Sequence, residues 1–370
     1  MQLVDRLQEY FLIYKMNKRN WEFIIVKATI LQAPNQITLK EVEIPVIGTG
    51  DLLIRMRAAT VCGTDIRIFR GRKTLGVRYP SILGHEFAGE IVDTGGRREF
   101  SVGDRIGLCP AISCGQCYRC KRGAENLCEE GMNFGYEIDG GFAEFVRIPS
   151  KAVDSGNVRK LPANMTFGEA ALVEPLSCVL NGQEKVNLGF ADIVVIIGAG
   201  PIGLMHVLLA RLRGAMKIIV SDPNQYRRDA AMRFGADVAI DPGTENVTAR
   251  VKAETDGRGA DVVLCAIGVP ALARQATDMV AHGGRVSLFA GFSKGDVSEM
   301  DINAIHYSEI TITGSFGLSR RNFDDAFDMV ALGRLNVAPL ITETFGLDEA
   351  PRAFEMAESG AALKVAIENV

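Results

Sequence analysis

A glycine-rich turn between an apolar strand and a helix restricts the fold of this chain more than any other sequence feature. Residues 193–197 form a continuous β-branched run, the letters GAGPIG follow, and a helical pattern of apolar residues comes next. Apolar strands that alternate with helices are typical of parallel sheets covered on both faces. In a G-x-G-x-x-G turn the first glycine makes the turn, the second lets a pyrophosphate approach the backbone, and the third allows close packing of helix and strand. The sequence therefore predicts an α/β unit that binds a dinucleotide at the N-terminus of this helix.

The residues expected to hold the dinucleotide come from this motif and from the end of the next strand. They are Gly198, Gly200, Pro201, Ile202, Gly203, Asp222 and Arg227. Asp222 comes nineteen residues after Gly203, where its carboxylate can accept hydrogen bonds from both ribose hydroxyls. A carboxylate there repels a 2′-phosphate, so NAD is favoured over NADP. Arg227 is expected near the adenine and Arg228 on a solvated helix face. A glycine-rich turn that binds nothing is the alternative interpretation.

The pattern along the chain indicates two kinds of structure. Residues 26–150 contain short alternating runs separated by Gly, Pro, Asn and Asp turns, which predict strands. Residues 166–186 look helical, with Pro175 expected to break or kink the middle. From residue 192 strands alternate with helices, and residues 309–370 return to a mixed character that is expected to complete the first domain. The predicted fold class is α/β, with a β-rich domain and a doubly wound parallel sheet.

Four cysteines within fifteen residues predict a structural metal site. Their spacing is C-x2-C-x2-C-x7-C, and the residues are Cys114, Cys117, Cys120 and Cys128. Four thiolates on one tight loop are the usual closed tetrahedral ligand set of structural zinc. A bacterial iron–sulfur run would need a last gap of three residues followed by proline, whereas here the gap is seven and Glu129 follows. The remaining alternative is four unrelated buried cysteines.

A second, sparser set of residues can hold a catalytic metal. Cys62 and Thr64 follow a predicted strand, and His85 and Glu86 follow a short loop. Glu174 precedes a proline at the start of the α/β region. A catalytic zinc takes three protein ligands and leaves one position open, and Cys62, His85 and a carboxylate would provide that set. Taken singly, His85 is a turn histidine and Cys62 a small buried hydrophobe, but the dinucleotide motif and the cysteine cluster favour the metal interpretation.

Length, composition and charge exclude several other classes of protein. A chain of 370 residues, of which 47% are hydrophobic, predicts two globular domains. The net charge of −4 gives no basic surface for a nucleic acid. No apolar run approaches the roughly 18 residues of a membrane span, so neither nucleic acid nor membrane is expected as a partner. Thiolate ligands need a reducing compartment, which points to a cytoplasmic protein.

Several motifs together resemble those of the zinc-dependent medium-chain alcohol and polyol dehydrogenases, over the chain from about Val26 to the C-terminus. They are CGTD (62–65), GHEFAGEIV (84–92), VGDRI (102–106), the four-cysteine segment, GGFAEF (140–145), EPL (174–176), GAGPIG (198–203), ITGS (312–315) and LKVAIE (363–368). Glu174 stands where the classical alcohol dehydrogenases have cysteine, which is similar to the sorbitol and threonine dehydrogenase branch.

The resemblance implies two domains and an oligomer. A GroES-like, β-rich catalytic domain is expected over residues 26–172 and 310–370, and a Rossmann NAD-binding domain over 173–309. Residues 1–25 remain as an N-terminal extension. Proteins of this family form homo-oligomers, so a tetramer or a dimer is expected.

The resemblance also implies the roles of the site residues. Cys62, His85 and Glu86 match catalytic zinc ligands. Glu174 matches a carboxylate that reaches this zinc directly or through its water, and the choice between Glu86 and Glu174 stays open. Thr64 is expected to accept the proton of the alcohol. The expected cofactors are NAD and two zinc ions per chain, one catalytic and one structural.

The expected reaction is hydride transfer from a small secondary alcohol, such as a polyol or sugar alcohol, to NAD+, which gives the ketone. L-Threonine or a sugar phosphate such as galactitol 1-phosphate is the alternative substrate, and a non-catalytic NAD-binding protein is the alternative of another class. Four basic residues follow the metal-binding cysteine: Arg67, Arg70, Arg72 and Lys73. They form either a solvated basic loop or a binding site for an anionic substrate.

Overall fold

The structure is a computed structural model that describes residues 24–369. Nearly all of the expected N-terminal extension therefore lies outside the described residues. The described chain forms two compact units, and each is described by itself below. The first contains residues 24–115, 130–172 and 343–369, and the second contains residues 116–129 and 173–342.

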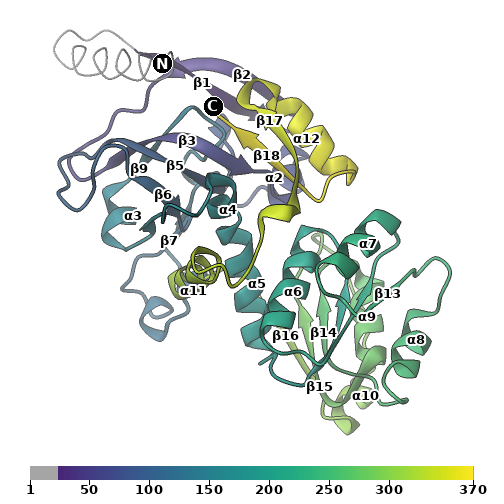
Figure 1. Cartoon of the computed structure of the whole chain (residues 1–370). Helices are drawn as coiled ribbons and strands as arrows, with labels where there is room; N and C mark the ends of the chain where they lie inside the picture. The colour runs from purple at the N-terminus through teal and green to yellow at the C-terminus, as the bar shows by residue number, and fades with distance from the viewer. Residues whose placement is uncertain (1–23, 370) are drawn as a thin grey trace. The chain divides into compact units, whose positions relative to one another are not determined.

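The first unit is built on two main sheets (Figure 1). The smaller contains β2 (Gln36–Glu43), β1 (Ile25–Ala33) and β4 (Ser81–Ile82), in that order. The larger contains, in spatial order, β10 (Val158–Lys160), β6 (Arg105–Leu108), β5 (Glu86–Asp93), β3 (Leu52–Thr60), β18 (Lys364–Glu368) and β17 (Ile341–Gly346), and β9 (Phe145–Ile148) also pairs with β3. A short pair is formed by β7 (Ala111–Ile112) and β8 (Met132–Asn133). The helices of this unit are α2 (Gly63–Phe69), α3 (Ser150–Asp154), α4 (Phe167–Ala171) and α12 (Ala350–Ser359).

Aromatic side chains fill the core of the first unit. Phe87 and Phe134 meet edge to face with ring centroids 5.5 Å apart, and Phe142 and Phe354 do the same at 5.5 Å. All four rings are fully buried, and burial of each stabilises the fold by about 2–3 kcal/mol. Because Phe354 lies in α12, the C-terminal segment is an integral part of this core.

The strand register brings three chain segments to one place in the larger sheet. Thr60, the last residue of β3, pairs with Glu86 of β5 on one side and with Ala366 of β18 on the other. Cys62 follows β3, and His85 immediately precedes β5. The end of β3 therefore lies beside the starts of β5 and β18, and these segments carry the candidate metal ligands.

The second unit is a six-stranded parallel sheet (Figure 1). Its spatial order is β13 (Val238–Ile240), β12 (Lys217–Ser221), β11 (Ile193–Ile197), β14 (Ala260–Cys265), β15 (Val280–Leu288) and β16 (Thr311–Gly314). The helices of the unit are α5 (Val173–Lys185), α6 (Pro201–Leu212), α7 (Gln225–Arg233), α8 (Val247–Ala253), α9 (Pro270–Met279), α10 (Ile302–Tyr307) and α11 (Arg320–Ala331). This is the doubly wound order in which the sequence reverses direction between β11 and β14, where such sheets bind nucleotides. The predicted α/β class is confirmed.

The two units differ from the expected domain boundaries in two segments. β16 pairs in parallel with β15, and α11 packs on α5, so residues 310–342 belong to the second unit rather than the first. Residues 116–129 also belong to the second unit, because the amide of Asn126 donates to the carbonyl of Phe316 at 2.7 Å. In both cases the sheet and turn hydrogen bonds are made with partners that are distant in the sequence.

The helical stretch expected over 166–186 is interrupted, but not at its proline. α4 ends before Leu172 and α5 begins at Val173. Pro175 lies in the first turn of α5, where its missing N–H has no helical partner to lose. The expectation that Pro175 breaks the helix was therefore wrong: the interruption lies three residues earlier, at Leu172.

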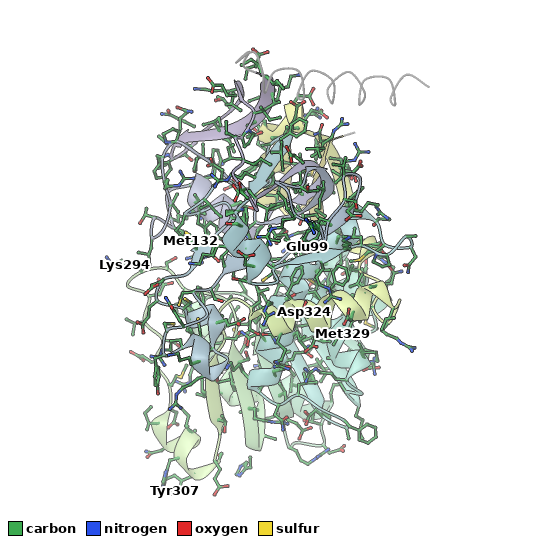
Figure 2. The ribbon with its side chains drawn as sticks, turned by 90° about the vertical axis from the view of Figure 1, so that its left-hand side faces the viewer. Glu99, Met132, Lys294, Tyr307, Asp324 and Met329 are labelled. Atoms are coloured by element: carbon green, nitrogen blue, oxygen red, sulfur yellow. The ribbon has the colours of Figure 1, made fainter. Side chains whose placement is uncertain are left out.

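Single large apolar side chains project from the surface of the described chain. Figure 2 shows Lys294 and Tyr307 directed outward, and Tyr307 is 78% exposed. None of the helices within residues 24–369 combines the length and apolar character that crossing a bilayer requires.

Candidate active site

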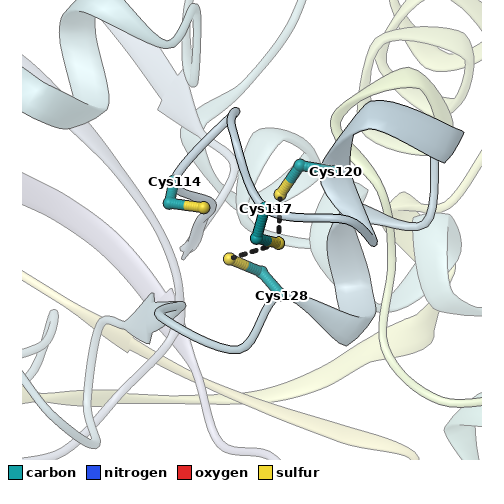
Figure 3. A group of neighbouring side chains, drawn as sticks. All are labelled: Cys114, Cys117, Cys120 and Cys128. Carbon is teal, nitrogen blue, oxygen red and sulfur yellow. Dashed lines mark hydrogen bonds between the residues drawn. The ribbon is translucent and has the colours of Figure 1, made fainter.

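The four-cysteine segment brings its sulfur atoms together, as Figure 3 shows. All four Sγ atoms lie within 4.8 Å of one another. Cys117 Sγ is 3.5 Å from Cys120 Sγ and 3.9 Å from Cys128 Sγ, which is too long for a disulfide bond of about 2.05 Å. Zinc bonded to four sulfurs at about 2.3 Å places them roughly 3.8 Å apart. The donor set and its spacing therefore fit a structural zinc.

The backbone of this segment folds so that each cysteine can face one centre. The 3₁₀ turns η1 (Cys120–Arg122) and η2 (Glu125–Leu127) follow one another, joined by Gly123 in the left-handed region at φ 74°. Arg122 and Arg119 lie over the exposed ring of Tyr118, at 4.7 and 5.6 Å from its centroid. With four protein ligands a zinc here has no position left for a substrate, so the site holds a loop in shape.

The second ligand group lies within the first unit. The ligand atoms of Cys62, His85 and Glu86 all lie within 4.8 Å of one another. Cys62 precedes α2 and is half-buried, whereas His85 and Glu86 are buried. A thiolate, an imidazole and a carboxylate are a usual zinc donor set with one position left for substrate. The residues present therefore fit a catalytic zinc.

Asp65 supports both the cysteine and the histidine of this group. Its Oδ2 accepts a hydrogen bond from the backbone N–H of Cys62 at 2.9 Å, and its Oδ1 lies 3.3 Å from His85 Nδ1. Asp65 is fully buried. A carboxylate at Nδ1 fixes the imidazole orientation and leaves Nε2 for a metal, which is the arrangement that raises ligand basicity.

Negative and polar groups around His85 change its proton affinity. Burial alone lowers the pKa of His85, but Tyr136, Asp65 and Cys62 act in the opposite direction, and together they raise the pKa well above its usual value. The raised pKa favours the protonated imidazole, whereas a metal ligand must be neutral imidazole, so a proton and zinc compete for His85.

Glu86 has two partners that the sequence motifs alone did not indicate. It is fully buried, Lys364 Nζ lies 2.9 Å from its Oε1 and 2.6 Å from its Oε2, and Thr60 Oγ1 donates to Oε2. Lys364 is only 5% exposed, so its charge is also removed from solvent. The pairing could have been predicted from the lysine at the start of the otherwise apolar strand LKVAIE, because a buried ammonium needs a carboxylate partner.

Glu174 and Thr64, the other two predicted catalytic residues, lie on different units. Glu174 is buried in the first turn of α5 in the second unit, and its Oε1 lies 3.7 Å from Cys178 Sγ. Thr64 is half-buried in the first turn of α2, two residues after Cys62. The structure thus groups Cys62, His85, Glu86 and Thr64 within the first unit.

The glycine motif joins β11 to α6 as the spacing predicts, and each glycine has its own physical reason. Gly198 has φ +96°, which disfavours other residues. A Cβ on Gly203 would lie 1.9 Å from the carbonyl oxygen of Gly198, so only glycine allows this helix to approach the strand. A Cβ on Gly200 would meet no protein atom within 4 Å, so its space is open to a ligand. Pro201 and Ile202 begin α6, where backbone N–H groups are unpaired and attract phosphate.

Asp222 lies buried at the end of β12 and is bonded to the glycine turn. Its Oδ2 accepts from the backbone N–H of Ala199 at 2.8 Å, and its Oδ1 accepts from that of Asn224 at 2.8 Å. Arg227 is half-buried on the following helix, α7. These contacts fix the carboxylate at the strand end where the ribose of a dinucleotide is expected.

Arg228 is a site-supporting residue whose role the sequence did not reveal. It was expected on a solvated face, but it is only 7% exposed. Its guanidinium donates to the carbonyl of Asp222 at 2.7 Å and pairs with Asp241 at 2.9 Å. It therefore ties the loop after β12 to the loop after β13.

Two family models match this chain. The zinc-binding dehydrogenase model matches residues 201–331, and the alcohol dehydrogenase GroES-like domain model matches residues 48–163. The chain is 37% identical over 337 residues to an L-threonine 3-dehydrogenase of Pyrococcus furiosus, which covers 88% of this chain and 93% of that protein. It is 35% identical to an uncharacterized zinc-type alcohol dehydrogenase-like protein of Haemophilus influenzae, over 88% of this chain and 93% of the relative.

Solved structures agree with these matches. A zinc-binding dehydrogenase from Sinorhizobium meliloti bound to NADP has a TM-score of 0.88 at 32% identity, over 94% of this chain and 100% of the other. The 2R,3R-butanediol dehydrogenase from Bacillus subtilis has a TM-score of 0.84 at 26% identity, over 93% and 100%. With its structural four-cysteine site and its Cys-His-Glu site, the protein is a zinc-dependent dehydrogenase that acts on a CH–OH group with NAD(P). The chain belongs to the zinc-containing medium-chain alcohol dehydrogenase family.

Proposed function

We propose that this protein oxidises the secondary hydroxyl of a small β-hydroxy amino acid of the L-threonine type, with NAD+ as the hydride acceptor. The observation that carries the proposal is the 37% identity to an L-threonine 3-dehydrogenase over 88% of the chain. Several further relatives at 34–37% identity carry the same name. This similarity favours the threonine alternative over the polyol or sugar-alcohol reaction that the motifs alone suggested.

Within this proposal, Cys62 and His85 hold the catalytic zinc, with Glu86 as the third ligand. Bound zinc supplies a Lewis acid that lowers the pKa of the substrate hydroxyl, and bound NAD+ supplies the hydride acceptor. Asp65 keeps the imidazole of His85 in the ligating orientation. Thr64 accepts the proton that the hydroxyl loses and passes it toward solvent.

Gly198, Gly200 and Gly203 leave room for the pyrophosphate at the start of α6, and Asp222 accepts from the ribose hydroxyls. NAD is preferred over NADP, because the buried carboxylate of Asp222 would lie next to a 2′-phosphate. Arg227 contacts the adenosine. The protein works as a homo-oligomer, a dimer or a tetramer.

The experiment is a substrate panel with a matched site variant. L-Threonine, butane-2,3-diol, sorbitol and galactitol 1-phosphate are assayed for NAD+-dependent NADH formation. The largest kcat/KM is expected for L-threonine. Cys62→Ser is expected to lose turnover by about 10³-fold or more, to keep NADH binding and to hold one zinc per chain instead of two.

Two results would contradict the proposal in different ways. A kcat/KM at least tenfold higher for sorbitol or butane-2,3-diol than for L-threonine would favour the polyol or sugar-alcohol reaction instead. The absence of turnover with all four substrates, together with tight NADH binding, would favour the non-catalytic alternative.

A further inference from the structure

The four cations that follow Cys62 look alike in sequence, but the structure divides them into two pairs. The Arg70 side chain already binds other residues of the protein. Its guanidinium forms an ion pair with Glu358 of α12, donates through Nε at 2.9 Å to the same carboxylate, and donates through Nη1 to Asn35 at 2.8 Å. The hydrogen bond from Arg70, with further attraction from Arg70 and Arg72, lowers the pKa of Glu358. Arg70 and Arg72 therefore face α12.

Arg67 and Lys73 form the other pair. The backbone N–H groups of Arg72 and Lys73 both donate to the carbonyl of Arg67, at 2.7 and 3.2 Å, so the loop folds back onto Arg67, and the charge of Arg67 acts on the Lys73 ammonium. Both side chains are half-buried. Burial lowers the pKa of Lys73, Glu137 raises it, and Arg67 lowers it, so the charges of Glu137 and Arg67 both lie within electrostatic range of Lys73. Within residues 24–369 neither Arg67 nor Lys73 forms an ion pair.

Tyr136 connects this pair to the metal ligands. Lys73 Nζ lies 4.5 Å from the centroid of the Tyr136 ring, and the same ring lies 5.2 Å from that of His85. The Lys73 ammonium therefore sits on one side of the ring that contacts His85. Nζ donates one hydrogen bond, to the carbonyl of Leu75 at 2.9 Å, and an ammonium has three donors.

The local charge indicates what kind of ligand the pair can take. Arg67 and Lys73 carry two positive charges, and Glu137 carries one negative charge and is held by the backbone N–H of Asn133 at 2.8 Å. The sum is one excess positive charge on a half-buried surface. One carboxylate neutralises this excess, whereas a phosphate at about −1.5 to −2 would leave negative charge.

We propose that Arg67 and Lys73 bind the carboxylate of the substrate, so that the site selects secondary alcohols that carry a carboxylate close to the hydroxyl. The inference rests on the proposed function and adds the residues that recognise the acid. A guanidinium and an ammonium suit this task, because they present charged donors to both carboxylate oxygens. The half-burial of the pair makes such hydrogen bonds stronger than they are at a solvated surface.

The test measures binding without turnover. L-Threonine is titrated by calorimetry into the zinc-loaded enzyme saturated with NADH, where no hydride acceptor is present, and butane-2,3-diol serves as the neutral ligand. Lys73→Met and Arg67→Met are compared with Arg72→Met, which removes a cation from the same loop. In each of the first two variants we expect the Kd of L-threonine to rise about tenfold or more. The Kd of butane-2,3-diol should change by less than twofold, and Arg72→Met should change neither.

Several outcomes separate this inference from the proposed function. A Kd for L-threonine that stays within twofold in both Lys73→Met and Arg67→Met, or a wild-type enzyme that does not bind it, overturns the inference. Binding that depends on the pair, without oxidation of L-threonine under NAD+, leaves the inference standing and refutes the proposed function. Lys73→Arg keeps the charge and should keep the affinity, and two zinc ions per chain in each variant show that the fold is retained.

Discussion

Replacement of Lys364 by methionine is the most direct test of the charge balance at the candidate active site. Lys364 Nζ lies 2.9 and 2.6 Å from the two carboxylate oxygens of Glu86, and neither residue is more than 5% exposed. Methionine keeps most of the apolar stem, so the change chiefly removes the charge and its two hydrogen bonds. Hydrogen bonds to charged groups contribute about 1.5–3 kcal/mol each. Their sum agrees with the roughly 3–5 kcal/mol that is lost when a buried ion pair loses one partner.

The matched control is the double variant Lys364→Met with Glu86→Gln. It removes the whole ion pair, and a glutamine side chain can still bond to Thr60. Replacement of both charges of a buried pair is often close to neutral, so we expect this variant to lie within about 1–2 kcal/mol of the parent protein.

The assay is urea unfolding of the protein freed of metal by a chelator, followed by far-ultraviolet circular dichroism, because Glu86 is also the proposed third zinc ligand and its replacement would change any stability that comes from bound zinc. The reasoning is refuted if Lys364→Met costs less than about 1 kcal/mol, or if the double variant is as unstable as the single one. The first result would mean that the ion pair contributes little to the stability of the fold. The second would mean that Lys364 stabilises the fold by packing rather than by charge.

Four further predictions concern the second unit. Burial lowers the pKa of His206 to about 3. Between pH 6.5 and 5 the histidine is therefore protonated in the unfolded state but not in the folded state. The free energy of unfolding of the parent protein should fall by about 2 kcal/mol over this range. In urea titrations at both pH values His206→Gln should lack this loss, and the exposed control His282→Gln should retain it. Gly203→Ala puts a Cβ 1.9 Å from a carbonyl oxygen and should destabilise the protein by about 1–3 kcal/mol. Gly200→Ala should unfold at nearly the parent urea concentration but bind NADH at least about tenfold more weakly, and equal NADH affinity would contradict its assigned position. Cys120→Ser should reduce metal content from two zinc ions to one and increase proteolysis of the four-cysteine segment; unchanged zinc content would refute the structural site.

The parts of the site that could be predicted from the sequence are those whose geometry is local. Gly198, Gly200 and Gly203 lie within six residues, and the space that each must leave is set by one turn. The four cysteines lie on one loop of fifteen residues, so their spacing largely determines that their sulfur atoms can meet. In both cases the chain between the functional atoms is too short to adopt many other arrangements.

The parts that could not be predicted depend on strand register over long separations. Glu86 and Lys364 are 278 residues apart, and they meet only because β18 pairs with β3 in the same register that aligns β3 with β5. The pairing of β16 with β15, which moves residues 310–342 to the second unit, is of the same kind. Arg228 also differs from the expectation, because its partner Asp241 comes from the next strand-to-helix loop.

The charges around the catalytic ligands suggest why Lys364 belongs to this site. Bound zinc would take Cys62 as a thiolate and His85 as a neutral imidazole. The thiolate and the carboxylates of Asp65 and Glu86 would then bring three negative charges, which the metal and Lys364 would balance with three positive ones. Without Lys364 the group would carry an excess negative charge, which would disfavour loss of the proton from the substrate hydroxyl. The C-terminal strand thus contributes to the chemistry of the site through one lysine that does not need to contact the substrate.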